Sequence, residues 1–477
     1  MNASTFTRRD FLGNTSLGIG GIALAALLGR SDARAGDKPD PALNGGLHHR
    51  AKVKRVIQLF MNGGASQCDL FDYKPKLIER HGQTFDPGNG ERVEASISTP
   101  GNVMKSPYEW AQHGQSGRWV SGVLPHTAKI VDDLTFLMAM TSKSNVHGPA
   151  AYMQNTGFLL PGFPCMGAWI SYGLGSLSEN VPAFVVLPDA RGLPYNGRSA
   201  FTSGFLPANH QGTMINASAP QPITHLRPPP AAKFITPESR TEELALLGKM
   251  NAAHAAEHPG DSRLQARIES YELAARLQVA APELLDLAGE TDATKKLYGI
   301  DQPETAAFAK NCLLSRRMLE RGVRFVQVWG GHGGASGNWD NHTDIPKELG
   351  FIARATDQPT AALLQDLKSR GMLEDTLLIW TTEFGRMPFS QGSTGRDHNG
   401  GTFVSWMAGA GVKPGIAHGK SDEWSWKAVE GITTCYDFHA TILHLLGIDH
   451  EKLTFYHNGI NRRLTDVHGH VVKEILA

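Results

Sequence analysis

The chain has 477 residues, enough for one large α/β domain with insertions or for two or three smaller domains. Its 46 basic and 46 acidic residues cancel, and no basic block or alternation of basic and aromatic residues stands out, so nothing indicates a nucleic-acid surface. The 52 glycines and 27 prolines are more typical of a loop-rich, enzyme-like domain than of a helical bundle.

The first 35 residues have the pattern of a twin-arginine export signal. Arg8 and Arg9 precede an apolar segment at 17–28, and the sequence ARA at 33–35 supplies the small residues of a cleavage site. The apolar segment is short for a membrane span, and no other run of about 18 apolar residues follows. We predict that the twin-arginine machinery exports the protein, that residues 1–35 are removed, and that the mature protein is periplasmic or otherwise exported, without a stable membrane span. An uncleaved signal anchor is the alternative.

The four cysteines lie far apart in the sequence, at Cys68, Cys165, Cys312 and Cys435. They lack C-x-x-C spacing, which argues against a zinc ribbon or a thioredoxin-like site. An oxidising compartment permits disulfides, but the sequence does not determine their pairing.

A polar linker at 36–50 precedes a single predicted domain at 51–477. Its first strand, at 54–61, runs into the sequence NGGASQCDLFD. Glycines at that point allow the backbone to turn sharply at the edge of a sheet. Asp69 follows within a few residues and is a candidate oxygen ligand for a hard divalent cation; ordinary turn chemistry is the alternative.

Residues 120–140 combine a helical pattern with a short strand, and a polar loop then leads into a helix near His147. Pro149 suits the first turn of that helix. A side chain at a helix start lies at the positive end of the helix dipole, where an anionic ester would also bind. His147 is therefore predicted to be a metal ligand, an acid or base, or a helix cap.

A further strand is predicted at 183–188, and residues 205–300 form an irregular, proline-rich and then helical insertion that we expect to cover the site. The next strand, at 324–329, leads into a glycine-rich segment that contains Asp340 and His342. Because these two residues are separated by one position, an extended backbone turns both to the same side. A carboxylate and an imidazole on one side can bind zinc, manganese or a similar ion.

A helix at 358–369 leads to an apolar strand at 376–382, which ends on Glu383, with Arg386 close behind. Ligands of an open parallel α/β sheet bind at the carboxyl ends of its strands, so this pair is a site candidate; a simple ion pair is the alternative. A glycine-flanked loop at 395–401 then carries Arg396, Asp397 and His398. A strand at 403–407 and a helix at 436–446 complete the chain.

These residues follow four different buried strands, so they converge on one edge of the predicted sheet. The blocks GGASQCDLFD, NWDNHTD, TLLIWTTEFGRMP, GRDHNGG and DFHATILHLLGIDH also give the chain a resemblance to the DUF1501 group, sulfatase-like members of the alkaline phosphatase superfamily. That resemblance extends from about residue 53 to the C-terminus. It implies a sheet of mostly parallel strands sandwiched by helices, with metal ions at the carboxyl ends of the strands.

The resemblance also implies roles for individual residues. Metal ligands would come from Asp69, Asp340, His342, Glu383, Asp397 and His398. Phe384 stands where the family has a second ligand, which implies one divalent ion, with zinc, manganese, calcium and magnesium all open. His147 stands where sulfatases carry the cysteine that becomes formylglycine, so His147 would be the nucleophile or base, and Arg386 or Arg396 would stabilise charge on the transferred group.

We therefore predict an exported metal-dependent hydrolase of sulfate or phosphate esters that works without formylglycine. Its substrate would be a small-molecule or polysaccharide ester. The alternative is a non-catalytic protein that binds polysaccharide or a larger assembly on a degenerate sulfatase-like fold. The oligomeric state is left open.

Overall fold

The structure is a computed structural model that describes residues 47–88, 98–223, 236–258 and 262–477, together with residues 90, 93 and 96. The export signal at 1–35 and most of the linker at 36–50 lie outside the described residues, so both stay predictions. Within the described ranges, no helix has the length and apolar character needed to cross a membrane.

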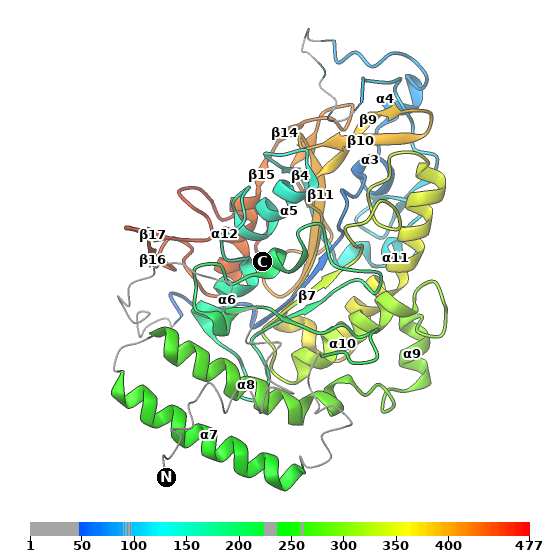
Figure 1. The fold of residues 1–477 in the computed structure, drawn as a ribbon. Coiled ribbons are helices and arrows are strands. Elements are labelled where there is room, and N and C mark those ends of the chain that lie inside the picture. The colour runs from blue at the N-terminus through cyan, green and yellow to red at the C-terminus, as the bar shows by residue number, and fades with distance from the viewer. Residues whose placement is uncertain are drawn as a thin grey trace, which may run out of the picture.

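A mixed, mostly parallel sheet of nine strands forms the centre of the fold (Figure 1). In spatial order its strands are β12 (Ile416–His418), β4 (Thr135–Thr141), β11 (Phe403–Gly409), β8 (Thr376–Thr381), β1 (Arg55–Phe60), β7 (Phe325–Trp329), β5 (Phe184–Leu187) and β6 (Thr213–Met214), with β15 (Thr433–Thr434) paired to β4. Only β11 runs antiparallel to its neighbours in this sheet, β4 and β8. The predicted α/β class is confirmed.

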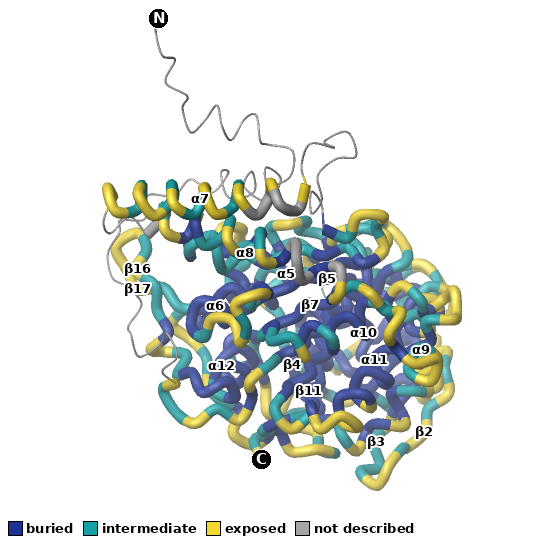
Figure 2. The backbone as a smooth tube through the Cα atoms, turned by 90° about the horizontal axis from the view of Figure 1, so that it is seen from below, coloured by how far each residue is buried: buried dark blue, intermediate teal, exposed yellow. Residues whose placement is uncertain are grey.

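Helices cover both faces of the sheet because its strands are apolar on both sides. In β1, Val56 and Phe60 face one hydrophobic cluster, while Ile57 and Leu59 face the other. The first face carries α5 (His147–Thr156), α6 (Met166–Leu174) and α12 (Cys435–Leu445), and the second carries α10 (Ala306–Glu320), α11 (Ile345–Ser369) and the 3-10 helix η1 (Thr127–Asp133). The buried part of the backbone lies between these layers (Figure 2).

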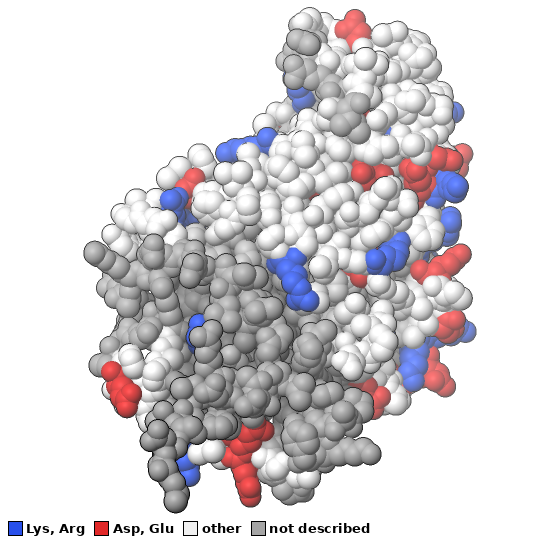
Figure 3. Space-filling view, viewed as in Figure 1, with Lys and Arg blue, Asp and Glu red and all other residues white. Residues whose placement is uncertain are grey.

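Smaller elements surround the sheet. They are α3 (Gln67–Leu70), α4 (Pro75–Glu79), β2 (Trp110–His113), β3 (Arg118–Ser121), η2 (Gly197–Phe201), η3 (Ala208–His210), α7 (Pro237–Glu257), α8 (Ser262–Leu285), α9 (Asp292–Tyr298), η4 (Met372–Glu374), β9 (Gly385–Gln391), β10 (Gly395–Asn399), β13 (Lys420–Ser421), β14 (Ala428–Glu430), β16 (Phe455–His457), β17 (Ile460–Arg462) and η5 (Lys473–Ile475). Acidic and basic side chains are interspersed on the described part of the face seen in Figure 3.

The segment at 395–401 is a strand rather than the predicted loop. β9 and β10 form an antiparallel hairpin in which His398 lies opposite Arg386 and Asn399 lies opposite Gly385. Glycines on both sides of a segment are typical of a loop. In the structure they lie at the ends of a fully buried strand, and this pairing fixes the direction of the His398 side chain.

Helix α11 is twice as long as predicted. The sequence predicts a helix at 358–369. The helix instead begins at Ile345 and continues through Pro359. An interior proline costs about 3 kcal/mol, but Ile345, Leu349 and Ile352 of the added turns are fully buried, and their packing offsets this cost.

Helices α7 and α8 lie within residues 205–300, of which residues 224–235 and 259–261 lie outside the described part. In Figure 1, α7 lies at the opposite end of the molecule from β9 and β10. The expectation that this insertion covers the site is therefore wrong for α7.

All four cysteines are buried free thiols, so none of the disulfides that export permits is present. Burial raises the pKa of Cys165 to about 12, which keeps this thiol protonated and unreactive at neutral pH. These cysteines therefore act as small apolar core residues.

Candidate functional site

Four side chains meet where β7, β8 and β10 end. His147 begins α5, Asp340 and His342 follow β7, and His398 belongs to β10. Asp340 Oδ1 lies 3.1 Å from His147 Nε2, 2.6 Å from His342 Nε2 and 3.2 Å from His398 Nε2. The candidate ligand atoms all lie within 4.8 Å of one another. This group, called the His/Asp cluster below, could hold one metal ion.

Each histidine of the cluster is oriented by an oxygen at its other ring nitrogen. The Nδ1 acceptors are Glu383 Oε1 for His147 (2.7 Å), the Asn145 carbonyl for His398 (2.7 Å) and Gln391 Oε1 for His342. An acceptor at Nδ1 holds the proton of a neutral imidazole there and leaves the lone pair on Nε2. The three Nε2 lone pairs therefore face Asp340 Oδ1.

This donor set fits a cation. The Nε2 atoms of His342 and His398 lie 2.8 Å apart, although a neutral ring with its proton on Nδ1 has none to donate from Nε2. Burial lowers the pKa of His398 to about 4, so that ring is neutral at pH 7. Burial alone would raise the pKa of Asp340, but Arg386 and the three histidines hold it well below its usual range, so the carboxylate is ionised. Lone pairs that point at one another repel, and a metal ion bound by all of them makes this arrangement energetically favourable.

The cluster is closed on one side and open on the other. The side chains of His147 and His398 are only 9% and 7% exposed. His342 and Asp340 keep 20% and 15% exposure. An ion bound here would therefore be reached from the side of His342.

Glu383, predicted to be a metal ligand, instead lies behind His147. Its side chain is fully buried, and its Oε1 accepts hydrogen bonds from His147 Nδ1 and from the Gly63 amide at 2.7 and 2.8 Å. A carboxylate behind a metal-bound histidine fixes the ring and increases its basicity. Burial alone would lower the pKa of His147, but the neighbouring carboxylates of Asp340 and Glu383 outweigh this effect and raise it.

Arg386, predicted to stabilise charge on a substrate, is fully buried and is bonded to protein acceptors. Its guanidinium contacts Asp340 Oδ1 at 2.6 Å, the Gly64 carbonyl at 2.8 Å and the Gly63 carbonyl. Gly63 has φ +122°, and a Cβ there would lie 2.6 Å from the Asp340 amide nitrogen. Only glycine therefore allows this turn to approach the Asp340 loop so closely. Arg386 positions Asp340 and the turn after β1.

Three other predicted site residues lie outside the His/Asp cluster. Asp69 forms a fully buried ion pair with Arg396, at 2.7 Å to Nε and 3.0 Å to Nη2. Asp397 accepts hydrogen bonds from the amide and hydroxyl of Ser98 at 3.1 and 2.9 Å. It lies next to His398 on β10, at an irregularity in the pairing with β9 between Arg396 and His398. The predicted ligand roles of Asp69 and Asp397 and the substrate contact of Arg396 therefore do not match their positions.

Phe384 occupies space beside the cluster. Its fully buried ring lies 4.8 Å, between ring centroids, from both His147 and His398. An aromatic ring supplies no ligand atom for a second ion at this place. That one ion rather than two binds here stays a prediction.

Tyr195 also contributes to the cluster, and we did not predict it from the sequence. Its ring stacks on His147 with centroids 4.3 Å apart and an interplanar angle of 9°, and its hydroxyl donates to Asp340 Oδ2 at 3.2 Å. Tyr195 lies in an irregular segment between β5 and η2, without a motif that marks it. Its neighbour Asn196 donates to the Gly148 carbonyl at 2.8 Å and so ties this segment to the start of α5.

We expect Tyr195→Phe to weaken metal binding by about tenfold, at the lower end of the effects seen when a hydrogen bond behind a ligand is removed. The phenyl ring keeps the stacking on His147, so the free energy of unfolding should change by only about 1 kcal/mol. Competition with a chromogenic chelator measures the affinity, and Tyr195→Ala, which also removes the stacking, should weaken it further. Equal affinities in the wild type and both variants would contradict this role.

Comparison with solved structures finds distant matches. A sulfatase, PsFucS1 from Pseudoalteromonas sp., is 13% identical with a TM-score of 0.36, covering 84% of this chain and 69% of its own. The lipoteichoic acid synthase LtaP from Listeria monocytogenes is 10% identical with a TM-score of 0.36, covering 90% and 78%. An alkaline phosphatase from the Antarctic bacterium TAB5 is 11% identical with a TM-score of 0.31, covering 76% and 94%.

No curated protein matches the chain. The model of one protein family, DUF1501, described as a protein of unknown function, matches residues 53–476. This match spans the whole described α/β domain, including all four residues of the His/Asp cluster. The chain therefore belongs to the DUF1501 family.

Proposed function

We propose that the protein is an exported, metal-dependent hydrolase of sulfate or phosphate esters. The single observation that carries the proposal is the convergence of three imidazole Nε2 atoms on the ionised Asp340 carboxylate, with an oxygen acceptor behind each ring. A donor set of three imidazoles and one carboxylate suits zinc or manganese better than calcium or magnesium, which prefer all-oxygen sites.

A divalent ion held there would polarise an ester oxygen as a Lewis acid and would activate water. The residues of the chain bind and orient it: His147, His342, His398 and Asp340 are the ligands, and Arg386 holds Asp340 in place. An anionic ester would approach from the side of His342, the most exposed member of the cluster. For hydrolysis the ion must keep a fifth position free, since four protein donors already complete a tetrahedral site.

Water is a better candidate for the nucleophile than His147. A nucleophilic histidine needs a free lone pair, but the His147 Nε2 lone pair is directed at Asp340 Oδ1, 3.1 Å away, and Nδ1 is bound to Glu383. We therefore assign His147 the role of a ligand. With water as the nucleophile, the proposed hydrolysis forms no covalent intermediate with the protein.

A second candidate is a metal-stabilised binding protein. Two observations favour it: four protein donors suffice to close a tetrahedral site, and both Arg386 and Arg396 already bind protein acceptors. In that case the ion would stabilise the loops after β7 and β8, and the edge of the sheet would bind a ligand without cleaving it.

The test removes and restores the metal. The purified protein is stripped with a chelator, reconstituted separately with zinc, manganese, magnesium or calcium, and assayed on an aryl sulfate and an aryl phosphate. We expect turnover of one ester to disappear on stripping and to return with zinc or manganese. Tight metal binding without turnover of either ester would favour the binding protein, and turnover that survives complete stripping would contradict the proposed mechanism.

A further inference from the structure

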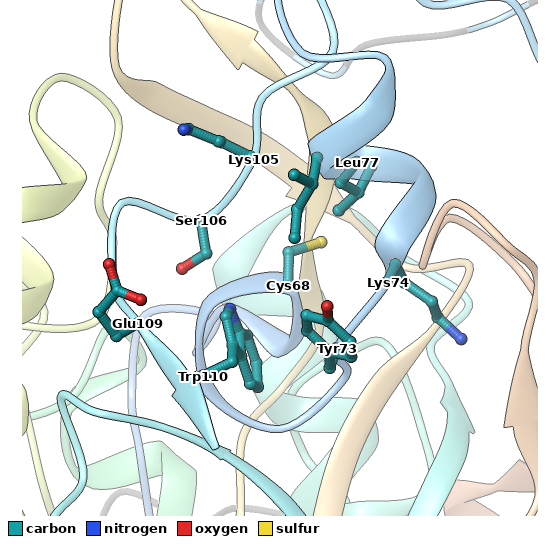
Figure 4. Close-up of a pocket in the computed structure, with 9 residues that line it drawn as sticks. Cys68, Tyr73, Lys74, Leu77, Lys105, Ser106, Glu109 and Trp110 are labelled. Carbon is teal, nitrogen blue, oxygen red and sulfur yellow. The ribbon is translucent and has the colours of Figure 1, made fainter. Parts of the chain in front are cut away.

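A pocket lies beside α3, which contributes Cys68 to its lining. It has a volume of about 220 Å³, below the ~300–1,000 Å³ typical of pockets for drug-sized ligands. Its lining residues are Cys68, Tyr73, Lys74, Leu77, Ile78, Lys105, Ser106, Glu109 and Trp110 (Figure 4). The size suits one ring-sized unit.

Residues outside the pocket fix the positions of side chains that line it. Tyr73 stacks on Trp119 with ring centroids 4.1 Å apart, and Trp110 lies 5.6 Å from Tyr73. Trp110 and Trp119 belong to the paired strands β2 and β3. The Lys74 ammonium is bound by Asp72 at 3.1 Å and by the Ser421 carbonyl at 3.4 Å. The two aromatic rings are therefore positioned before any ligand arrives.

Several polar groups around the pocket have no protein partner among the residues that the structure describes. These are the Tyr73 hydroxyl, the Trp110 indole N–H, the Lys105 ammonium and the Glu109 carboxylate. They include donors and an acceptor, and they carry one positive and one negative charge. Ring faces, an apolar floor and unpaired donors and acceptors together match a sugar ring, which has apolar C–H faces and a rim of hydroxyls.

We propose that this pocket binds one pyranose unit of a polysaccharide. The proposal rests on the proposed function, because it makes the pocket a subsite for the carbohydrate part of an ester substrate. Helix α3 connects the pocket to the His/Asp cluster. Cys68 of this helix lines the pocket, and Gln67 bonds to both the amide and the carbonyl of Arg386 at 2.8 Å. The Arg386 guanidinium in turn binds Asp340.

Direct binding tests the pocket independently of hydrolysis. Maltohexaose, cellohexaose and agarohexaose are titrated separately into the full chain and followed by saturation-transfer NMR, with sorbitol as a polyol that lacks a ring. We expect saturable binding of at least one hexasaccharide and none of sorbitol. Trp110→Ala should weaken that binding by about tenfold or more, as for a central aromatic contact. Tyr456→Ala, which removes an exposed aromatic ring on β16, should not change it.

If Trp110→Ala fails to fold, Lys105→Ala still tests the pocket. Lys105 is exposed and its ammonium has no partner within the described ranges, so its removal should leave the fold intact. It should also weaken binding, by a smaller factor. Lack of saturable binding to all three hexasaccharides, or equal affinity in the wild type and both pocket variants, would overturn the subsite. Hexasaccharide binding without any ester turnover would leave the subsite standing and would reject the hydrolase.

Discussion

Asp340→Asn should lose almost all bound metal and all ester turnover. Asp340 Oδ1 is the atom shared by the cluster, within 3.2 Å of three histidine nitrogens and of Arg386 Nη2. An amide keeps the shape of the side chain but removes the charge that a cation needs. The loss of metal affinity should exceed the ~10–100-fold loss that follows from removing a group that only hydrogen-bonds to a metal ligand. Metal content after dialysis measures the loss of metal. The loss of turnover is measured as kcat on whichever aryl ester, sulfate or phosphate, the wild type hydrolyses.

Two further variants separate loss of the ligand from loss of the fold. Asp340→Asn leaves the buried Arg386 without its carboxylate, so the variant could be destabilised as well. His342→Gln removes one Nε2 from the most exposed side of the cluster and leaves no buried charge unpaired, so it should lose metal while it stays folded. His332→Gln is the matched control, because His332 lies in the same glycine-rich segment but outside the cluster. Full metal content in Asp340→Asn would show that Asp340 is not a ligand.

Asp69→Asn should destabilise the fold by about 3–5 kcal/mol, the cost of leaving a buried charge without its partner. Asp69 and Arg396 are both fully buried, and the carboxylate accepts two hydrogen bonds from the guanidinium and one from Ser66 Oγ at 2.6 Å. Burial alone would lower the pKa of Arg396, but the Asp69 charge outweighs this effect and raises it. Urea unfolding of the wild type and the variant measures the difference in the free energy of unfolding.

The exposed pair between Lys368 and Asp133 provides the matched control, since its side chains are 59% and 28% exposed. Asp133→Asn should cost no more than about 1 kcal/mol. The double variant Asp69→Leu with Arg396→Met removes both charges and should recover part of the stability lost in Asp69→Asn. Loss of metal without loss of stability in Asp69→Asn would instead support the ligand role that the sequence suggested for Asp69.

The strands that position the site could be predicted because their signal is local. β1, β7 and β8 are short apolar runs that end at glycine or at a charged residue, and each was predicted to within two residues. Their order in the sheet and the pairing of β9 with β10 depend on contacts between distant segments, which periodicity does not contain. For that reason His398 was expected in a loop, although its direction is set by pairing with β9.

The division of the acidic residues between ligands and supporting groups could not be read from the sequence. Asp69, Asp340 and Glu383 all follow buried strands, yet only Asp340 contributes an oxygen to the cluster. Asp69 is bound by Arg396, 327 positions later in the chain, and Glu383 is bound by His147, 236 positions earlier. The role of a carboxylate depends on which cation or ring the fold places beside it. Tyr195 was not predicted for the same reason, since its contact with Asp340 spans 145 positions.

The most direct test of the metal site is the metal content of the wild-type protein, purified from a host that exports it and measured by inductively coupled plasma mass spectrometry. The same measurement on His342→Gln and His332→Gln shows whether the metal depends on the cluster. We expect about one equivalent of zinc or manganese in the wild type and in His332→Gln, and a large loss in His342→Gln. A wild-type protein without bound metal, or equal metal in all three proteins, would contradict the proposed site.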